Sequence, residues 1–161
     1  PGTDRTYAQR DLLLRNDGKG RFVAEPLSAA APTVSRAGAL ADLDGDGDLD
    51  VVALRVEGPV RVLRNDAVHD ASHHWLRVAL RAKSGDPFAL GARVTAEWSG
   101  GRSVAEVRTA GGYQASVPAE AHFGLGAAAK LERLVVRWPS GREQVLTDVA
   151  VDRRLVVEEA P

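Results

Sequence analysis

The sequence lacks cysteine altogether, and it has neither a long apolar run nor an excess of charge of either sign. The missing thiols exclude a disulfide scaffold, a thiolate zinc site and a cysteine nucleophile. There is no run of about 18 apolar residues that could cross a bilayer, and no stretch resembles a signal peptide. With 21 Lys and Arg against 22 Asp and Glu, the chain also lacks the basic surface typical of nucleic-acid binding. We therefore expect no nucleic-acid partner and no membrane span.

The sequence does contain enough apolar residues for one sizeable core or two small ones, since 44% of its 161 residues are hydrophobic. It begins at Pro1, so we expect a piece of a longer chain or a processed product. Two internal similarities are present. "LRND" occurs at 14–17 and 63–66, and "RVTAEWSGGR" at 93–102 resembles "RLVVRWPSGR" at 133–142. Two kinds of repeat predict two regions, 1–68 and 69–161, joined in the polar stretch 65–74.

Alternation of apolar and polar residues predicts strands through most of the chain. Leu76, Val78 and Leu80 alternate with polar or small residues, which is the period of a half-buried strand. The same period predicts two hairpins that turn at "SGG" and "PSG". The only helix-like composition is "GAAAKLE", residues 126–132, which is long enough for two turns at most. The prediction is an all-β protein.

Five aspartates alternate through "DLDGDGDLD", at positions 1, 3, 5, 7 and 9 of a loop. They are Asp42, Asp44, Asp46, Asp48 and Asp50. Ca²⁺ takes roughly 6 to 8 oxygen ligands, and alternating carboxylates on a tight turn can surround it. Gly45 and Gly47 permit the positive φ that such a turn needs. The loop is thus predicted to bind Ca²⁺, and the alternative is a solvated acidic turn.

An EF-hand is excluded because its twelfth position requires a glutamate, and here that position is Ala53. Instead, residues 38–66 resemble the FG-GAP or VCBS-type repeat of calcium-binding β-propellers, through "ADLDGDGDLDVVAL" and "GPVRVLRND". "DLLLRNDGKGRF" at 11–22 is similar to the end of a preceding repeat. The resemblance implies side-chain ligands at positions 1, 3, 5 and 9 and a carbonyl ligand at Asp48.

A propeller needs typically 4 to 8 blades, and this chain supplies about one and a half. We therefore expect these partial blades to pack on the C-terminal region, on the remainder of a larger propeller chain or on another protein.

Residues 73–159 resemble the ASPIC/UnbV domain. The similarity rests on "GARV" (91–94), "GGY" (111–113), "HFGLG" (122–126) and "VRWPSGR" (136–142). It implies an accessory antiparallel β-sandwich-like domain that follows VCBS-type repeats in secreted or envelope proteins. Such domains are also encoded beside some bacterial biosynthetic clusters. The resemblance implies no known reaction.

Other motifs have simpler interpretations than catalysis. "GLGAAA" (124–129) matches a dinucleotide-binding pattern, but a strand resumes by Leu131, which favours a turn. His69, His73 and His74 could bind a transition metal, although their place in the linker favours linker or capping roles. His122 is expected to satisfy a hydrogen bond rather than to catalyse. Ser140 is expected in a hairpin turn.

Trp98 and Trp138 end the two similar strands and could stack on a carbohydrate if they were exposed. Their alternation with apolar residues favours core packing instead. Arg102 and Arg142, which follow the two turns, are expected either to stack on these rings or to remain solvated.

Together these features predict partial β-propeller blades of VCBS/FG-GAP type followed by a C-terminal antiparallel β-sandwich-like domain. The expected function is a non-catalytic, calcium-binding extracellular or periplasmic module for adhesion, assembly or ligand binding. Calcium would rigidify the last blade. An enzyme or accessory factor of a bacterial biosynthetic pathway is the alternative, and it rests only on the genomic surroundings of the family. A convergent nucleophile, base and orienting group is not evident in the sequence.

Overall fold

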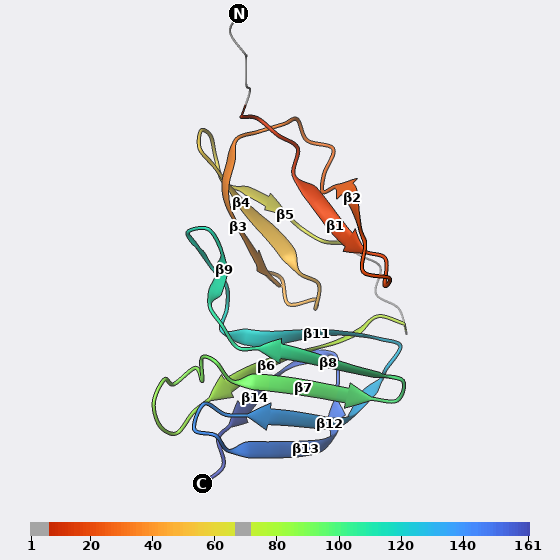
Figure 1. Ribbon diagram of the computed structural model, residues 1–161, viewed down its shortest axis with the longest axis vertical. Coiled ribbons are helices and arrows are strands. Elements are labelled where there is room, and N and C mark those ends of the chain that lie inside the picture. Colours follow the sequence, from red (N-terminus) through yellow and green to blue (C-terminus); the bar gives the residue numbers. More distant parts are fainter. Residues whose placement is uncertain (1–6, 67–71) are drawn as a thin grey trace, which may run out of the picture.

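The computed structural model of the chain describes residues 7–66 and 72–161. The described residues form strands and turns, with no helix among them, so the predicted all-β class is confirmed. The molecule is elongated, with strands up to residue 63 towards one end and strands from residue 74 towards the other (Figure 1). The predicted boundary between residues 68 and 69 lies outside the described residues.

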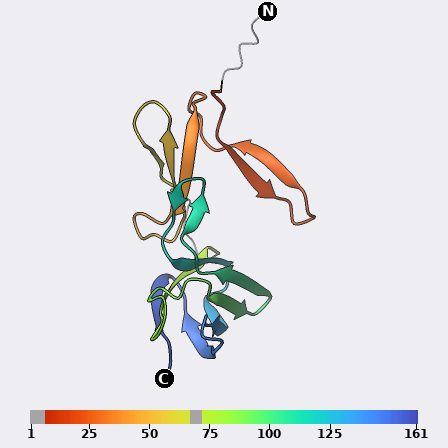
Figure 2. The ribbon, with the colours of Figure 1, turned by 60° about the vertical axis from the view of Figure 1, so that its left-hand side comes forward.

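The N-terminal strands form two small antiparallel sheets, β1-β2 and β3-β4-β5. Their bounds are β1 (Leu12–Asn16), β2 (Phe22–Pro26), β3 (Ser35–Ala41), β4 (Asp50–Arg55) and β5 (Arg61–Leu63). The polar turn "DGKGR" closes the β1-β2 hairpin with Asn16 opposite Phe22. Figure 2 shows this hairpin standing away from the sheet of β3, β4 and β5.

The C-terminal strands form two larger sheets and one small hairpin. Their bounds are β6 (His74–Arg81), β7 (Arg93–Trp98), β8 (Gly101–Glu106), β9 (Ala110–Gly112), β10 (Ala115–Ser116), β11 (Glu120–Gly126), β12 (Lys130–Arg137), β13 (Glu143–Ala150) and β14 (Arg153–Glu158). One sheet has the order β11-β6-β14 and the other β13-β12-β7-β8. Both predicted hairpins, β7-β8 and β12-β13, are confirmed.

The two larger sheets pack their apolar faces together around one core. Leu76 and Val78 of β6 are buried, as are Phe123 of β11 and Leu134 and Val136 of β12. Every second residue of a strand points to the same face, so these alternating positions all meet in the space between the sheets. The predicted sandwich is therefore present, and β11 lies at its end towards the N-terminal strands (Figure 1).

Two details differ from the prediction. Strand β14 pairs with β6 in parallel, although the sandwich was expected to be antiparallel throughout. The reason is that β13 and β14 belong to different sheets, so the short connection between them passes from one sheet to the other and does not form a hairpin. Residues 126–132 are not helical either, because β11 extends to Gly126 and β12 begins at Lys130. The strand pairing on either side leaves only a short turn.

Candidate metal centre

The aspartate-rich loop connects β3 to β4 at the end of their sheet that faces the C-terminal sandwich (Figure 1). Ala41 and Asp50 are paired across the hairpin, so the loop spans the residues between them. Its two glycines have positive φ, 84° at Gly45 and 101° at Gly47. These left-handed residues curl the loop back on itself, as the sequence predicted. Local chemistry therefore fixes the shape of the loop.

Three carboxylates converge within this loop. Asp42, Asp44 and Asp50 each offer one oxygen, and these oxygens all lie within 4.8 Å of one another. Asp42 and Asp50 are buried, whereas Asp44 is exposed. Oxygen donors are the ligands that a hard divalent cation prefers. The described residues thus contain a cluster that could hold a metal ion, and its donors fit such a cation.

Asp50 is held as a carboxylate by the backbone. Its two side-chain oxygens accept hydrogen bonds of 2.8 Å from the amides of Asn65 and Leu43. These two amides lower the pKa of Asp50, the amide of Asn65 having the larger effect, and they outweigh the burial that raises it. The group therefore stays charged at neutral pH, and it ties the loop to the segment after β5.

Asp46 and Asp48 lie in the same loop but outside the converging group of three. The amide of Asp48 donates to Asp46 Oδ1 at 2.9 Å, and the amide of Asp46 is 3.4 Å from Asp44 Oδ1. Such bonds between an aspartate and a nearby amide are typical of tight turns. The structure thus brings together three of the five predicted ligands, and the ligand roles of all five remain predictions.

A cation from the C-terminal sandwich also contacts the loop, which the sequence did not suggest. Arg77 Nη1 on β6 donates to Asp42 Oδ2 at 2.7 Å, and Arg77 Nε donates to Glu120 Oε2 at 3.1 Å. Burial lowers the pKa of Arg77, but the hydrogen bond to Asp42 and the charge of Glu120 outweigh it, so the pKa is raised. The loop and the sandwich are therefore joined by a part-buried ion pair.

Gly47 carries two further contacts with the sandwich. Its carbonyl accepts a hydrogen bond of 2.7 Å from His122 Nε2, so the predicted hydrogen-bonding role of His122 is confirmed. The indole of Trp75 lies directly against the α-carbon of Gly47. A Cβ added to Gly47 would come within 2.2 Å of that ring. A glycine is therefore required here both for its φ and for the close approach of Trp75.

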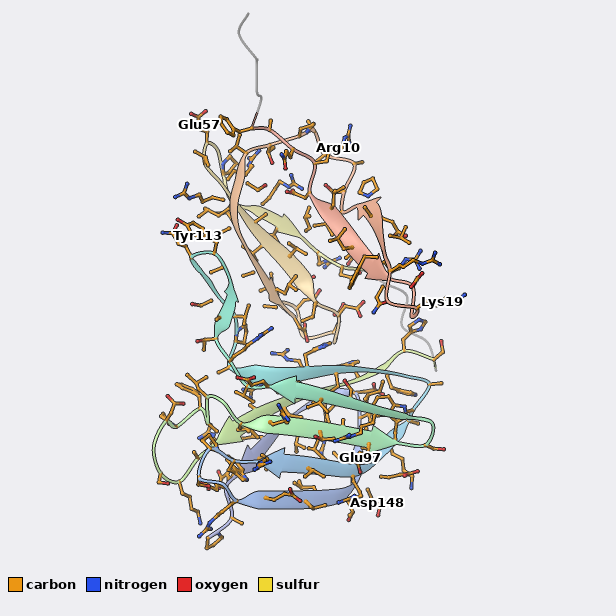
Figure 3. The ribbon with its side chains drawn as sticks, viewed as in Figure 1. Arg10, Lys19, Glu57, Glu97, Tyr113 and Asp148 are labelled. Atoms are coloured by element: carbon orange, nitrogen blue, oxygen red, sulfur yellow. The ribbon has the colours of Figure 1, made fainter. Side chains whose placement is uncertain are left out.

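A small hairpin extends the same interface. Strands β9 and β10 project from the sandwich and lie beside β3, with Tyr113 at the tip (Figure 3). The Arg36 guanidinium is 5.3 Å from the centre of the Tyr113 ring, and its Nη2 is 3.4 Å from the hydroxyl. This geometry is a cation–π contact. The hairpin and the loop contacts together hold the last N-terminal sheet on the sandwich.

A cavity of about 200 Å³ lies between the loop, the hairpin and β11. Its lining is Leu40, Ala41, Asp42, Leu49, Arg77, Arg108, Ala110, Gly111, Val117, Pro118, Glu120 and His122. Two side chains of this lining already have hydrogen-bond partners. His122 donates to the loop, and Glu120 accepts from Arg77 and Arg154. Its lining, taken over the described residues, contains no serine, threonine, cysteine or lysine. These contacts build an interface between the two regions.

Family models match both regions. An FG-GAP-like repeat matches residues 5–53, which include the loop, and the model for ASPIC and UnbV matches residues 82–161. The chain carries an FG-GAP-like repeat followed by an ASPIC/UnbV domain. Both predicted resemblances are thereby confirmed. Residues 54–81, with Trp75 and Arg77, lie outside both matches.

Relatives of this FG-GAP and ASPIC/UnbV chain include cartilage acidic protein 1 from three vertebrates. The protein from Xenopus tropicalis is 36% identical to this chain over 109 residues. Over the same length, the protein from Mus musculus is 35% identical and that from Homo sapiens 34%. Each alignment covers 65% of this chain but 16% of the relative. The chain thus corresponds to a minor part of these relatives. Within its described residues, no helix is long and apolar enough to span a membrane.

The tryptophans of the ASPIC/UnbV domain belong to its packing. Trp138 is buried in the core, and Trp98 packs against the core and the α-carbon of Gly101. Core packing is therefore confirmed for both. Arg142 donates to the carbonyl of Ala160, and Arg102 lies 3.6 Å from a carboxylate oxygen of Glu97. Both arginines are exposed, Arg102 with 66% of its side chain, so the expectation that they stay solvated is confirmed.

The remaining candidates of the ASPIC/UnbV region have structural partners. His74 begins β6 and pairs with Asp152 through Nδ1 at 2.7 Å, whereas His69 lies outside the described residues. Ser140 lies in the β12-β13 turn, as predicted, and donates to Glu159 at 2.6 Å. The "GLGAAA" segment ends a strand and turns at Gly126, whose φ is 56°. The predicted turn is confirmed.

Proposed function

We propose that the chain is a calcium-binding extracytoplasmic module for adhesion, assembly or ligand binding, in which the ion rigidifies the last FG-GAP-like repeat. The observation that supports this most is the convergence of Asp42, Asp44 and Asp50 at the surface where the ASPIC/UnbV domain docks. Asp46 would add a side-chain ligand and Asp48 a carbonyl ligand. When bound, calcium would neutralise carboxylates that otherwise repel one another.

An extracellular or periplasmic location fits this proposal. Extracellular calcium modules typically have dissociation constants of about 10⁻⁴ to 10⁻³ M, so the loop would fill outside cells and stay largely empty in cytosol. At about ten dissociation constants of free calcium, binding would stabilise the fold by roughly 1.4 kcal/mol. The stabilisation would act on the loop and on the last FG-GAP-like repeat that the loop belongs to.

Calorimetric melting with calcium and with a chelator tests the proposal. We expect calcium to raise the melting temperature of the native sequence, and D44N to lose that rise. Asp44 is exposed, so its substitution should disturb the metal-free fold little. D17N is the matched control, because Asp17 lies in the β1-β2 turn. Equal melting temperatures in both buffers would exclude calcium as a stabilising ligand.

The proposed partner is the remainder of a larger propeller chain or another protein. Leu12, Leu14 and Phe22 on the β1-β2 hairpin are more than half exposed. A group of large exposed apolar residues is typical of a surface that another element covers. A carbohydrate ligand is a further proposal, and residues other than Trp138 would have to bind it, because that ring is buried in the core.

The alternative, an enzyme or accessory factor of a biosynthetic pathway, has less support. His122 and Glu120 do lie together at the interdomain cavity, but the first donates to Gly47 and the second holds two arginines. The contacts of both groups therefore support a structural role at the junction.

A further inference from the structure

Arg77 is a cation that already contacts the candidate metal centre. Its guanidinium lies 2.7 Å from Asp42 Oδ2, and the Asp42 side chain is fully buried in this pair. Glu120 holds the same guanidinium through Nε at 3.1 Å. Glu120 is in turn bonded by Arg154 at 2.7 Å. Arg77 is therefore fixed in position by the ASPIC/UnbV domain, with one edge of its guanidinium directed at a predicted ligand.

We infer that Arg77 is a built-in counter-cation that competes with the divalent ion for the charge of Asp42. The inference rests on the proposed calcium binding. In the metal-free loop, the three converging carboxylates repel one another, and Arg77 offsets part of that repulsion. A divalent ion at the same carboxylates is repelled by the guanidinium. Arg77 thus stabilises the loop without metal and weakens its affinity for metal.

This arrangement couples metal binding to the docking of the two regions. Arg77 belongs to β6, whereas Asp42 follows β3, so their ion pair exists only when the sandwich lies on the loop. Coupling between two binding events is reciprocal. If the docked arginine lowers the affinity for calcium, then bound calcium weakens this arginine contact by the same factor. The Trp75 and His122 contacts do not involve a carboxylate of the loop and are expected to persist.

The test compares R77Q with R154Q by calorimetric titration with calcium. Arg154 is the matched control, since it also pairs with Glu120 and makes no bond to the loop. Removal of a positive charge beside the ion should lower the dissociation constant of R77Q about fivefold. R154Q should stay within about twofold of the native value, because its charge is more distant and more exposed.

Melting temperatures provide a second measurement. Without calcium, R77Q should melt below the native chain, because Asp42 loses its counter-charge. With saturating calcium, this difference should shrink. If R77Q does not fold without calcium, the inference requires that calcium restores its folding. A variant that stays unfolded with calcium would contradict the inference.

The outcomes separate this inference from the proposed function. Native binding with an unchanged or weaker R77Q would overturn the role of Arg77 and leave the calcium proposal standing. If R77Q binds calcium and the native chain does not, the role of Arg77 is supported and calcium binding by the native chain is overturned. If neither protein binds calcium, both proposals are wrong. R77K keeps the positive charge, so its affinity for calcium should be close to that of the native chain. If R77K gained as much affinity as R77Q, an electrostatic cause would be contradicted.

Discussion

The two regions of the molecule are both built from strands, but they bury apolar side chains very differently. In the ASPIC/UnbV domain, two sheets face each other and enclose a continuous core. In the FG-GAP-like region, Ala53 is the one buried hydrophobic residue among those described. Many of its large apolar residues, such as Leu14 and Phe22, are exposed, and others, such as Val51 and Val52, are partly buried. The difference lies in whether a second sheet is present to cover the first.

This comparison shows how a repeat depends on its neighbours. A sheet is stable when one of its faces packs against another layer. The sandwich supplies both of its layers from residues 74–158, whereas β3, β4 and β5 meet the sandwich mainly through a loop and the β9-β10 hairpin. The stability of the FG-GAP-like region should therefore depend on its junction with the sandwich.

Matched truncations of leucine should give the largest contrast between the regions. Leu134→Ala removes a fully buried side chain, and Leu14→Ala removes one that is 59% exposed. We expect the first to lower the free energy of unfolding by about 2 to 5 kcal/mol and the second by under about 0.5 kcal/mol. Urea unfolding monitored by tryptophan fluorescence measures both. Equal losses would mean that the N-terminal strands have a core of their own.

Glycine substitutions at the junction of the two regions should have an intermediate effect on the free energy of unfolding. Gly45→Ala places a side chain at positive φ with nothing within 4 Å, whereas Gly47→Ala also places one within 2.2 Å of the Trp75 indole. The first should lower the free energy of unfolding by about 1 to 2 kcal/mol through the backbone. The second should cost about 1 to 3 kcal/mol more through overpacking. The fluorescence of Trp75 should change only in Gly47→Ala, and an identical cost for both variants would contradict the close contact.

The smallest expected effect is the loss of one hydrogen bond to a single carboxylate, which is measured as a change in its pKa. The Ser140 hydroxyl, followed by the Lys83 amide, lowers the pKa of Glu159 below its ordinary value of 4.5. Because the folded pKa is the lower one, this stabilisation is present above pH 4.5 and is lost as the pH falls through the folded pKa. In Ser140→Ala, a carbon-detected NMR titration should show the Glu159 pKa rise towards 4.5.

Asp17 provides the internal control for that titration. Its pKa is lowered chiefly by the amide of Lys19, two residues away in the β1-β2 turn. The value for Asp17 should therefore stay unchanged in Ser140→Ala. A simultaneous shift of both carboxylates would indicate that the substitution disturbs the whole molecule rather than one hydrogen bond.

Much of the fold could be predicted because its signals are local. The period of two along "RVTAEW" and "RLVVRW" identified the buried faces of β7 and β12, and the glycine turns identified their hairpins. The parallel pairing of β14 with β6 could not be predicted in this way. Both strands have ordinary alternating patterns, and a pattern within one strand does not specify which distant strand lies beside it.

The sequence by itself determined the tight acidic turn: alternating aspartates and two glycines favour it, since the bonds from the Gly45 amide to Asp42 and from the Asp48 amide to Asp46 reach only two or three residues. Only the tertiary structure decided what meets that turn. Arg77, Trp75 and His122 come from other strands, up to 75 residues away, and look like ordinary strand residues in the sequence. They reach the loop because β6 and β11 are packed side by side under it, and such packing depends on the whole core rather than on neighbours in sequence.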